Sequence, residues 1–134
     1  MASLFLESCE TESIEVDWGD QVLSNQLTVV SNNGIHPSRG DPNRSWVPPR
    51  TGIYHVFYEV RWTKSQVPLA NVCVYVRAGE TEVLKGKPKS LDTMVTRTGF
   101  MFVNLGERVQ LRINNGEEGL TELKHVVFVM SLVQ

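Results

Sequence analysis

The sequence lacks a segment that could span a membrane, because no apolar run approaches the roughly 18 residues that such a helix needs. Its first residues, MASLFLESCETES, also lack the basic start and long apolar stretch of a secretory signal peptide. Two alternatives follow from these absences. The protein is either cytosolic, or an ectodomain excised from a longer protein with Met1 added in front.

Cysteine is scarce as well, with two residues in a chain of 134. One bond between Cys9 and Cys73 is the most that could form, so no disulfide framework is implied and the pairing itself stays open. Cys73 lies between Val72 and Val74. This apolar context predicts a buried thiol that packs as a small hydrophobic side chain.

Patterns for catalysis and metal binding are missing too. His36, His55 and His125 have no HExxH or CxxC spacing around them. The sequence contains no Gly-x-Ser-x-Gly nucleophile turn and no glycine-rich phosphate loop. We therefore expect no enzymatic activity, no bound cofactor and no metal site.

Positive charge is not in excess, since 13 Lys and Arg residues stand against 15 Asp and Glu residues for a net charge of −2. Such a balance provides no electrostatic attraction to a nucleic-acid backbone, so nucleic acid is not an expected partner. One small basic cluster, Lys85, Lys87 and Lys89, lies in the predicted loop KGKPK. Its charges serve either solubility or contact with a receptor.

The most strongly patterned stretch is Thr51–Trp62, TGIYHVFYEVRW. Aromatic and β-branched residues recur there with a period of two, which predicts a strand whose successive side chains point to opposite faces. One face is wholly apolar and is predicted to lie in the core, whereas the reverse face mixes apolar with charged residues. The core face carries Tyr54, Val56, Tyr58, Val60 and Trp62, and the reverse face carries Ile53, His55, Phe57, Glu59 and Arg61. A half-apolar reverse face predicts contact with another subunit.

Further strands are predicted by short apolar or alternating runs that are bounded by Gly, Pro, Asn and Asp. They cover Leu4–Leu6, Ile14–Trp18, Gln26–Ser31, Trp46–Val47, Ala70–Arg77, Thr81–Leu84, Thr93–Val103, Arg108–Asn114 and Leu123–Val133. No stretch has a helical period, so about eight to ten short antiparallel strands are expected in an all-β sandwich or barrel. We expect a single domain over residues 1–134, with residues 1–12 either flexible or foreign to it.

The final strand, Leu123–Val133, indicates which all-β architecture is present. Val126 and Phe128 fall on one face and Val127 and Val129 on the other, so both faces are apolar. A strand of this kind is expected in the centre of a sheet and covered on both sides. A sequence that closes with a central strand is unlike an up-and-down barrel and fits a jelly roll.

Three segments resemble one known superfamily. Gly52–Val60 (GIYHVFYEV) is similar to its Gly-Leu-Tyr-x-Val-Tyr-x-x-Val strand, and Phe102–Val109 (FVNLGERV) resembles the hairpin that contains its Gly-Asp/Glu turn. The apolar strand Val127–Val133 matches the strand with which the family usually ends. On these segments the chain resembles the jelly-roll superfamily shared by tumour necrosis factor ligands and the globular heads of complement-q-type proteins.

The departures from the family pattern leave the branch open. Val127–Val129 keeps the phenylalanine of the ligands' last strand but lacks the glycine that usually follows it. Trp46–Pro49 is similar to the lead-in of the complement-q-type heads, whereas Asp17-Trp18 and Gly106–Val109 are closer to the ligands.

The resemblance implies an extracellular homotrimer without enzymatic activity. We expect Phe57, with His55, Glu59 and Phe128, at the trimer interface. In the ligand branch a cell-surface receptor binds in the clefts between subunits and is clustered by the trimer. The alternatives are a complement-q-type recognition head that binds a partner protein or surface, and a jelly-roll subunit of a viral capsid or fibre head.

Two short motifs lie in the polar stretch before Trp46. Arg39-Gly40-Asp41 is the tripeptide that integrins recognise, although such a tripeptide is also common in solvated loops. Asn43-Arg44-Ser45 is a sequon for N-glycosylation, so Asn43 is either a sugar site or part of an unmodified turn.

Overall fold

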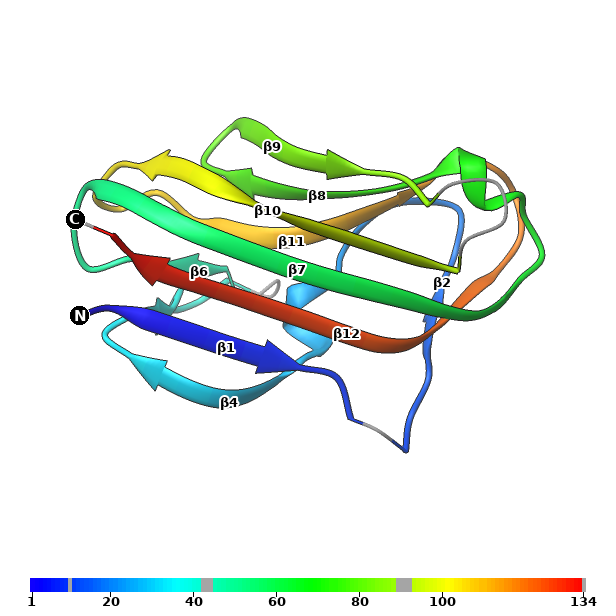
Figure 1. The fold of residues 1–134 in the computed structure, drawn as a ribbon, viewed down its shortest axis with the longest axis horizontal. Helices are drawn as coiled ribbons and strands as arrows, with labels where there is room; N and C mark the ends of the chain where they lie inside the picture. Colours follow the sequence, from blue (N-terminus) through cyan, green and yellow to red (C-terminus); the bar gives the residue numbers. More distant parts are fainter. Residues whose placement is uncertain (10, 42–44, 89–92, 134) are drawn as a thin grey trace.

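The computed structural model describes residues 1–9, 11–41, 45–88 and 93–133 of the chain, in which two antiparallel sheets of six strands face each other (Figure 1). The first sheet has the order β10 (Met94–Val103), β7 (Gly52–Ser65), β12 (Thr121–Leu132), β1 (Ser3–Glu7) and β4 (Thr28–Asn33), and β2 (Ile14–Val16) pairs with β12. The second sheet has the order β5 (His36–Pro37), β6 (Trp46–Val47), β11 (Val109–Asn115), β8 (Val72–Ala78) and β9 (Thr81–Gly86), and β3 (Gly19–Val22) pairs with β11.

The all-β jelly-roll sandwich predicted from the sequence is confirmed. Two short strands were not predicted. Gly19–Val22 contains Gly, Asp and Gln, which have weak strand propensity, and it is extended because β11 supplies pairing partners for all four residues. His36–Pro37 lies outside the predicted strands, in the polar stretch before Trp46, and pairs with Trp46–Val47.

The core is formed by the inward faces of the two central strands of the first sheet and by the side chains of the second sheet that oppose them. Tyr54, Val56, Tyr58 and Val60 of β7 have no exposed surface, which confirms the face assignment made from the alternation. β12 lies between β7 and β1, so its predicted central position is confirmed as well.

The N-terminal segment is part of this sheet. β1 pairs with β12 on one side and with β4 on the other, and its Leu4 and Leu6 are buried. Ser3–Glu7, within the segment expected to be flexible or foreign to the domain, is thus held in the sheet by two buried leucines and by strand pairing on both sides.

One buried tyrosine joins the two sheets. The hydroxyl of Tyr58 on β7 is within hydrogen-bonding distance of two carbonyl oxygens of the second sheet, that of Leu84 at 2.6 Å and that of Val74 at 3.1 Å. The pairing of β8 with β9 is irregular between Val74 and Val76, and Leu84 has a positive φ of 52°. The tyrosine thus satisfies carbonyl groups at a place where the strand ladder is interrupted.

Candidate functional site

The outward side of the first sheet presents a continuous set of apolar side chains, which we call the apolar face. The register aligns residues in rows across β10, β7, β12 and β1. One row is Thr98, Phe57, Val129 and Phe5, the next is Phe100, His55, Ser131 and Ser3, and beyond them Phe102 lies opposite Ile53. The apolar face comprises Phe5, Ile53, Phe57, Phe100, Phe102 and Val129.

Much of this face is in contact with water in the isolated chain. Phe100 and Phe102 are 67% and 61% exposed, and Ile53 is 47% exposed. Phe57 and Val129 are half-buried. Contiguous exposed apolar side chains of this kind mark interaction surfaces in soluble proteins.

The opposite end of the same face is charged. Arg61 Nε donates a hydrogen bond of 3.2 Å to Glu59 Oε2. The ring of His125 lies between two carboxylates, with Nδ1 3.4 Å from Glu59 Oε2 and Nε2 3.9 Å from Glu7 Oε1. The sheet surface is therefore apolar towards one end of the strands and charged towards the other.

Three of the four residues predicted at a subunit interface share this face. Phe57 lies within the apolar face and Glu59 begins the charged end. His55 Nε2 is 2.9 Å from Thr98 Oγ1, and its ring lies 5.2 Å from that of Phe100. Phe128 lies elsewhere: it points inward from β12 and is fully buried in the core. Its neighbours Val127 and Val129 point outward because adjacent residues of a strand face opposite sides.

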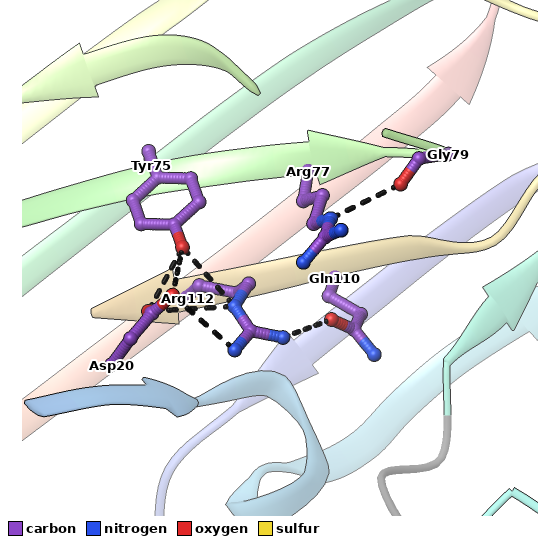
Figure 2. Close-up of polar contacts among 6 residues, drawn as sticks. All are labelled: Asp20, Tyr75, Arg77, Gly79, Gln110 and Arg112. Atoms are coloured by element: carbon purple, nitrogen blue, oxygen red, sulfur yellow. Dashed lines mark hydrogen bonds and ion pairs between the residues drawn. The ribbon is translucent and has the colours of Figure 1, made fainter. Parts of the chain in front are cut away.

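The outward side of the second sheet is polar, and its side chains form a connected network (Figure 2). The Tyr75 hydroxyl is 2.8 and 2.7 Å from the two carboxylate oxygens of Asp20. Arg112 lies 3.4 Å from Asp20 through Nη2 and donates from Nη1 to Gln110 Oε1 at 2.7 Å. Gln110 in turn donates from Nε2 to Ser45 Oγ at 2.6 Å. Side chains from β3, β8 and β11 and the residue before β6 are thereby held in fixed orientations.

Within this network the phenol of Tyr75 has a shifted pKa. Burial, followed by its hydrogen bond to Asp20, raises the pKa of Tyr75 to about 12. Both effects disfavour the phenolate, because an anion would lose hydration and would face a carboxylate. Tyr75 is therefore a neutral donor at ordinary pH.

The aspartate of the Arg39-Gly40-Asp41 motif belongs to the same network. Asp41 Oδ2 accepts hydrogen bonds from Ser45 Oγ at 2.6 Å and from the Ser45 amide at 3.3 Å, and it lies 3.6 Å from Arg108 Nη1. The Asp41 side chain is 7% exposed. Recognition of the tripeptide by an integrin needs an accessible carboxylate, so this buried and hydrogen-bonded orientation does not favour that role. Asn43 and Lys89 lie outside the described residues.

The remaining candidates are dispersed. Cys9 and Cys73 are free thiols, and Cys73 is half-buried on the outward side of β8 rather than in the core, because Val72 and Val74 occupy the inward positions. His36 is exposed on β5. Among the described residues no three His, Cys, Asp or Glu side chains are grouped as a metal site would require. Nor does that part of the chain contain a helix long and apolar enough to cross a membrane.

Comparison with known proteins identifies the architecture. No protein-family model matches the sequence, and no curated protein matches it significantly. Among solved structures, an Eiger TNF from S. frugiperda superposes with a TM-score of 0.63 at 10% identity, over 98% of this chain and 92% of the other. The globular domain of a zebrafish complement 1qA protein superposes with a TM-score of 0.59 at 12% identity, over 100% of this chain and 98% of the other. The chain has the tumour-necrosis-factor-like jelly-roll fold. This TNF-like fold also matches the PRD1 vertex protein P5, with a TM-score of 0.70 at 13% identity over 99% and 97% of the two chains.

The polar network was not predicted from the sequence. Asp20, Tyr75 and Gln110 are far apart in the chain, and β3 was not recognised as a strand. The alternation of Arg108–Asn114 does place Gln110 and Arg112 on the outward side, and this was the available signal. Their partners could be identified only after the pairing of β11 with β3 and β8 was known.

Proposed function

We propose that this TNF-like domain is an extracellular homotrimeric ligand without enzymatic activity, which binds and clusters a cell-surface receptor. The observation that carries the proposal is the exposed apolar face of the first sheet. The resemblance to TNF-type ligands implies a trimer whose threefold axis runs along this sheet, with Phe57, His55 and Glu59 directed at neighbouring subunits.

Energetics support a closed assembly of copies. Full burial of one phenylalanine side chain contributes about 1.5–3 kcal/mol, and a trimer would bury three copies of each contributing residue. The charged end of the face supports a parallel arrangement, because copies related by a threefold axis bring identical ends together. Glu59, Arg61 and His125 then meet one another rather than the phenylalanines, which avoids burying charge against apolar side chains.

Light scattering coupled to size exclusion at micromolar concentration tests the assembly. We expect three times the protomer mass of 15.1 kDa. The variant Phe57→Glu should keep the β-sheet circular-dichroism spectrum but elute as a monomer, because three carboxylates would be placed in an apolar contact. Trp18→Glu is a matched control, since Trp18 is 64% exposed outside the apolar face. A monomeric wild type, or a trimeric Phe57→Glu variant, would contradict the interface.

Receptor binding is tested separately with fluorescently labelled protein on intact cells of the source organism. We expect saturable binding that trypsin treatment of the cells removes and that Phe57→Glu weakens at least tenfold through lost multivalency. Equal binding of monomer and trimer would contradict clustering.

A second candidate is the head of a viral vertex or fibre, which the superposition on the PRD1 vertex protein P5 supports. The same apolar face would then join subunits of a spike. Antibody labelling of purified particles distinguishes the two, because a spike head stays with particles and a receptor ligand does not. A complement-q-type recognition head is the remaining alternative, and binding without a protease-sensitive receptor would favour it.

A further inference from the structure

The sequence contains two Asn-Gly dipeptides, Asn33-Gly34 and Asn115-Gly116, and each is preceded by another asparagine. Asn-Gly is the dipeptide in which a side-chain amide is most readily lost, because glycine has no Cβ atom to shield its backbone nitrogen. The local sequences are therefore matched, but the fold places them differently. Asn33 ends β4 at one edge of the first sheet (Figure 1), whereas Asn115 ends β11, which is paired on both sides.

The side chain of Asn33 is open to water. Every residue of β4 is exposed, and among the described strands β4 pairs with β1 alone. Ser3 of β1 lies opposite Asn33, so the Asn33 side chain is on the outward side of the sheet, in the row that contains His55. Asn33 Nδ2 donates at 2.8 Å to the carbonyl oxygen of Met1, which is itself 86% exposed. A hydrogen bond anchored on so exposed a residue opens at little cost.

The glycine that follows is in a turn with room around it. The Ile35 amide donates to Asn32 Oδ1 at 3.2 Å, so Asn33 and Gly34 lie inside a turn that the Asn32 side chain closes. Gly34 has a positive φ of 82°. A Cβ atom built on Gly34 would meet no other atom nearer than 3.7 Å, so this backbone is not tightly packed. The Gly34 nitrogen can therefore approach the side-chain carbonyl carbon of Asn33 when the end of β4 opens.

The second dipeptide is held at each atom that would have to react. Asn115 has no exposed surface, its Nδ2 donates to the carbonyl oxygen of Gly119 at 2.9 Å, and its Oδ1 accepts from the Glu117 amide at 3.3 Å. The Gly116 amide, which would supply the attacking nitrogen, donates to the carbonyl oxygen of Asn71 at 3.0 Å. Reaction at Asn115 thus requires the end of β11 to unfold locally.

We propose that Asn33 is a site of spontaneous deamidation and that the fold protects Asn115 from the same reaction. The Gly34 nitrogen bonds to the side-chain carbonyl carbon of Asn33, its proton passes to the departing amide nitrogen, and ammonia leaves behind a five-membered succinimide ring. Water then opens the ring. Cleavage at the former side-chain carbonyl gives aspartate, and cleavage at the backbone carbonyl gives isoaspartate. One water is consumed for each ammonia released, and nothing is oxidised or reduced.

Both products alter this edge of the first sheet. Each carries a carboxylate in place of the amide, so the hydrogen bond to the Met1 carbonyl oxygen loses its donor. Isoaspartate also routes the backbone through the side chain and adds one methylene group, which moves the chain after residue 33 out of register. A negative charge is then added to the row that contains His55. The modification does not depend on trimer formation, because all the reacting groups belong to one chain.

Ageing of the purified protein at 37 °C and pH 8 in water enriched in oxygen-18 tests the site. The label enters when water opens the ring, so it separates conversion during ageing from conversion during sample preparation. Trypsin places the two dipeptides on different peptides, residues 1–39 and 113–124, which tandem mass spectrometry quantifies. We expect conversion at Asn33 to be at least about tenfold faster than at Asn115, and the two rates to become similar in denaturing urea.

Gly34→Ala adds the shielding Cβ atom and should slow conversion at Asn33 at least about tenfold without changing Asn115. Gly106→Ala is the matched control for backbone strain, because Gly106 has a similar φ of 85° in a different turn. It should leave the rate at Asn33 unchanged. Equal rates at the two dipeptides in the folded protein, or no conversion at Asn33 over a period in which the urea-unfolded chain is converted, would overturn the proposal.

Discussion

Removing the hydroxyl of Tyr58 should destabilise the domain by an amount that its geometry sets. The hydroxyl lies 2.6 Å from the Leu84 carbonyl oxygen and 3.1 Å from that of Val74, and the tyrosine side chain has no exposed surface. In Tyr58→Phe the ring still fills the core, so the hydrophobic contribution is nearly unchanged. The loss is one hydrogen bond plus the cost of leaving a carbonyl group without a partner, together about 1–3 kcal/mol.

Urea unfolding at pH 7 and at one fixed protein concentration measures this loss, since assembly would make stability depend on concentration. Tyr54→Phe is the control. The Tyr54 hydroxyl donates at 2.7 Å to the carbonyl oxygen of the exposed residue Arg50, where water can replace it, so the expected loss is below about 1 kcal/mol. A Tyr58→Phe variant within about 0.5 kcal/mol of the wild type would show that this bond does not hold the two sheets together.

Two further predictions concern the same sheet-to-sheet contact and the polar network. A Cβ atom at Gly86 would lie 2.7 Å from both the Tyr58 hydroxyl oxygen and Val95 Cγ2. Gly86→Ala should therefore lower the free energy of unfolding, measured by urea titration, by about 1–3 kcal/mol. An unchanged free energy of unfolding would mean that β9 can move away from these two side chains without cost. Because the pKa of Tyr75 is raised from 10.0 to about 12, its contribution to stability is intact below pH 10 and is lost as the pH rises towards 12. Thermal unfolding should therefore show a larger loss of stability between those two pH values for the wild type than for Tyr75→Phe. Equal losses in the two proteins would contradict the raised pKa of Tyr75.

Periodicity predicted the elements in which one face is core and the other is not. The faces of β7 were assigned from alternation alone, because burying one set of side chains requires a strict period of two. β12 was located and placed centrally from its two apolar faces, but its outward side is only half-buried in the structure. The apolar face followed for the same reason, since Phe57 and Ile53 fall on the reverse side of β7. Phe128 was misplaced because a family resemblance, rather than the alternation of β12, assigned it to the interface.

Features that depend on pairing between distant segments could not be predicted from the sequence. β3 has weak propensity and is extended only because β11 lies beside it. Asp20 reaches Arg112 and Tyr75 through that pairing, so the alternation of β11 alone could not identify the partners in the polar network. The inward turn of Asp41 likewise depends on Ser45 and Arg108, whereas the tripeptide alone suggested an exposed loop.

The central position of β12 also affects how the protein is made. Ribosomes release β1 and β7 long before β12, yet these two strands are neighbours only through β12, which lies between them. Until residues 121–132 have left the ribosome, the nascent chain carries two unpaired strand edges and an uncovered set of core side chains. Such edges pair readily with other chains. The first sheet is therefore expected to form only after residues 121–132 have emerged, and the chain that still lacks them is the stage at which chaperones would be needed most.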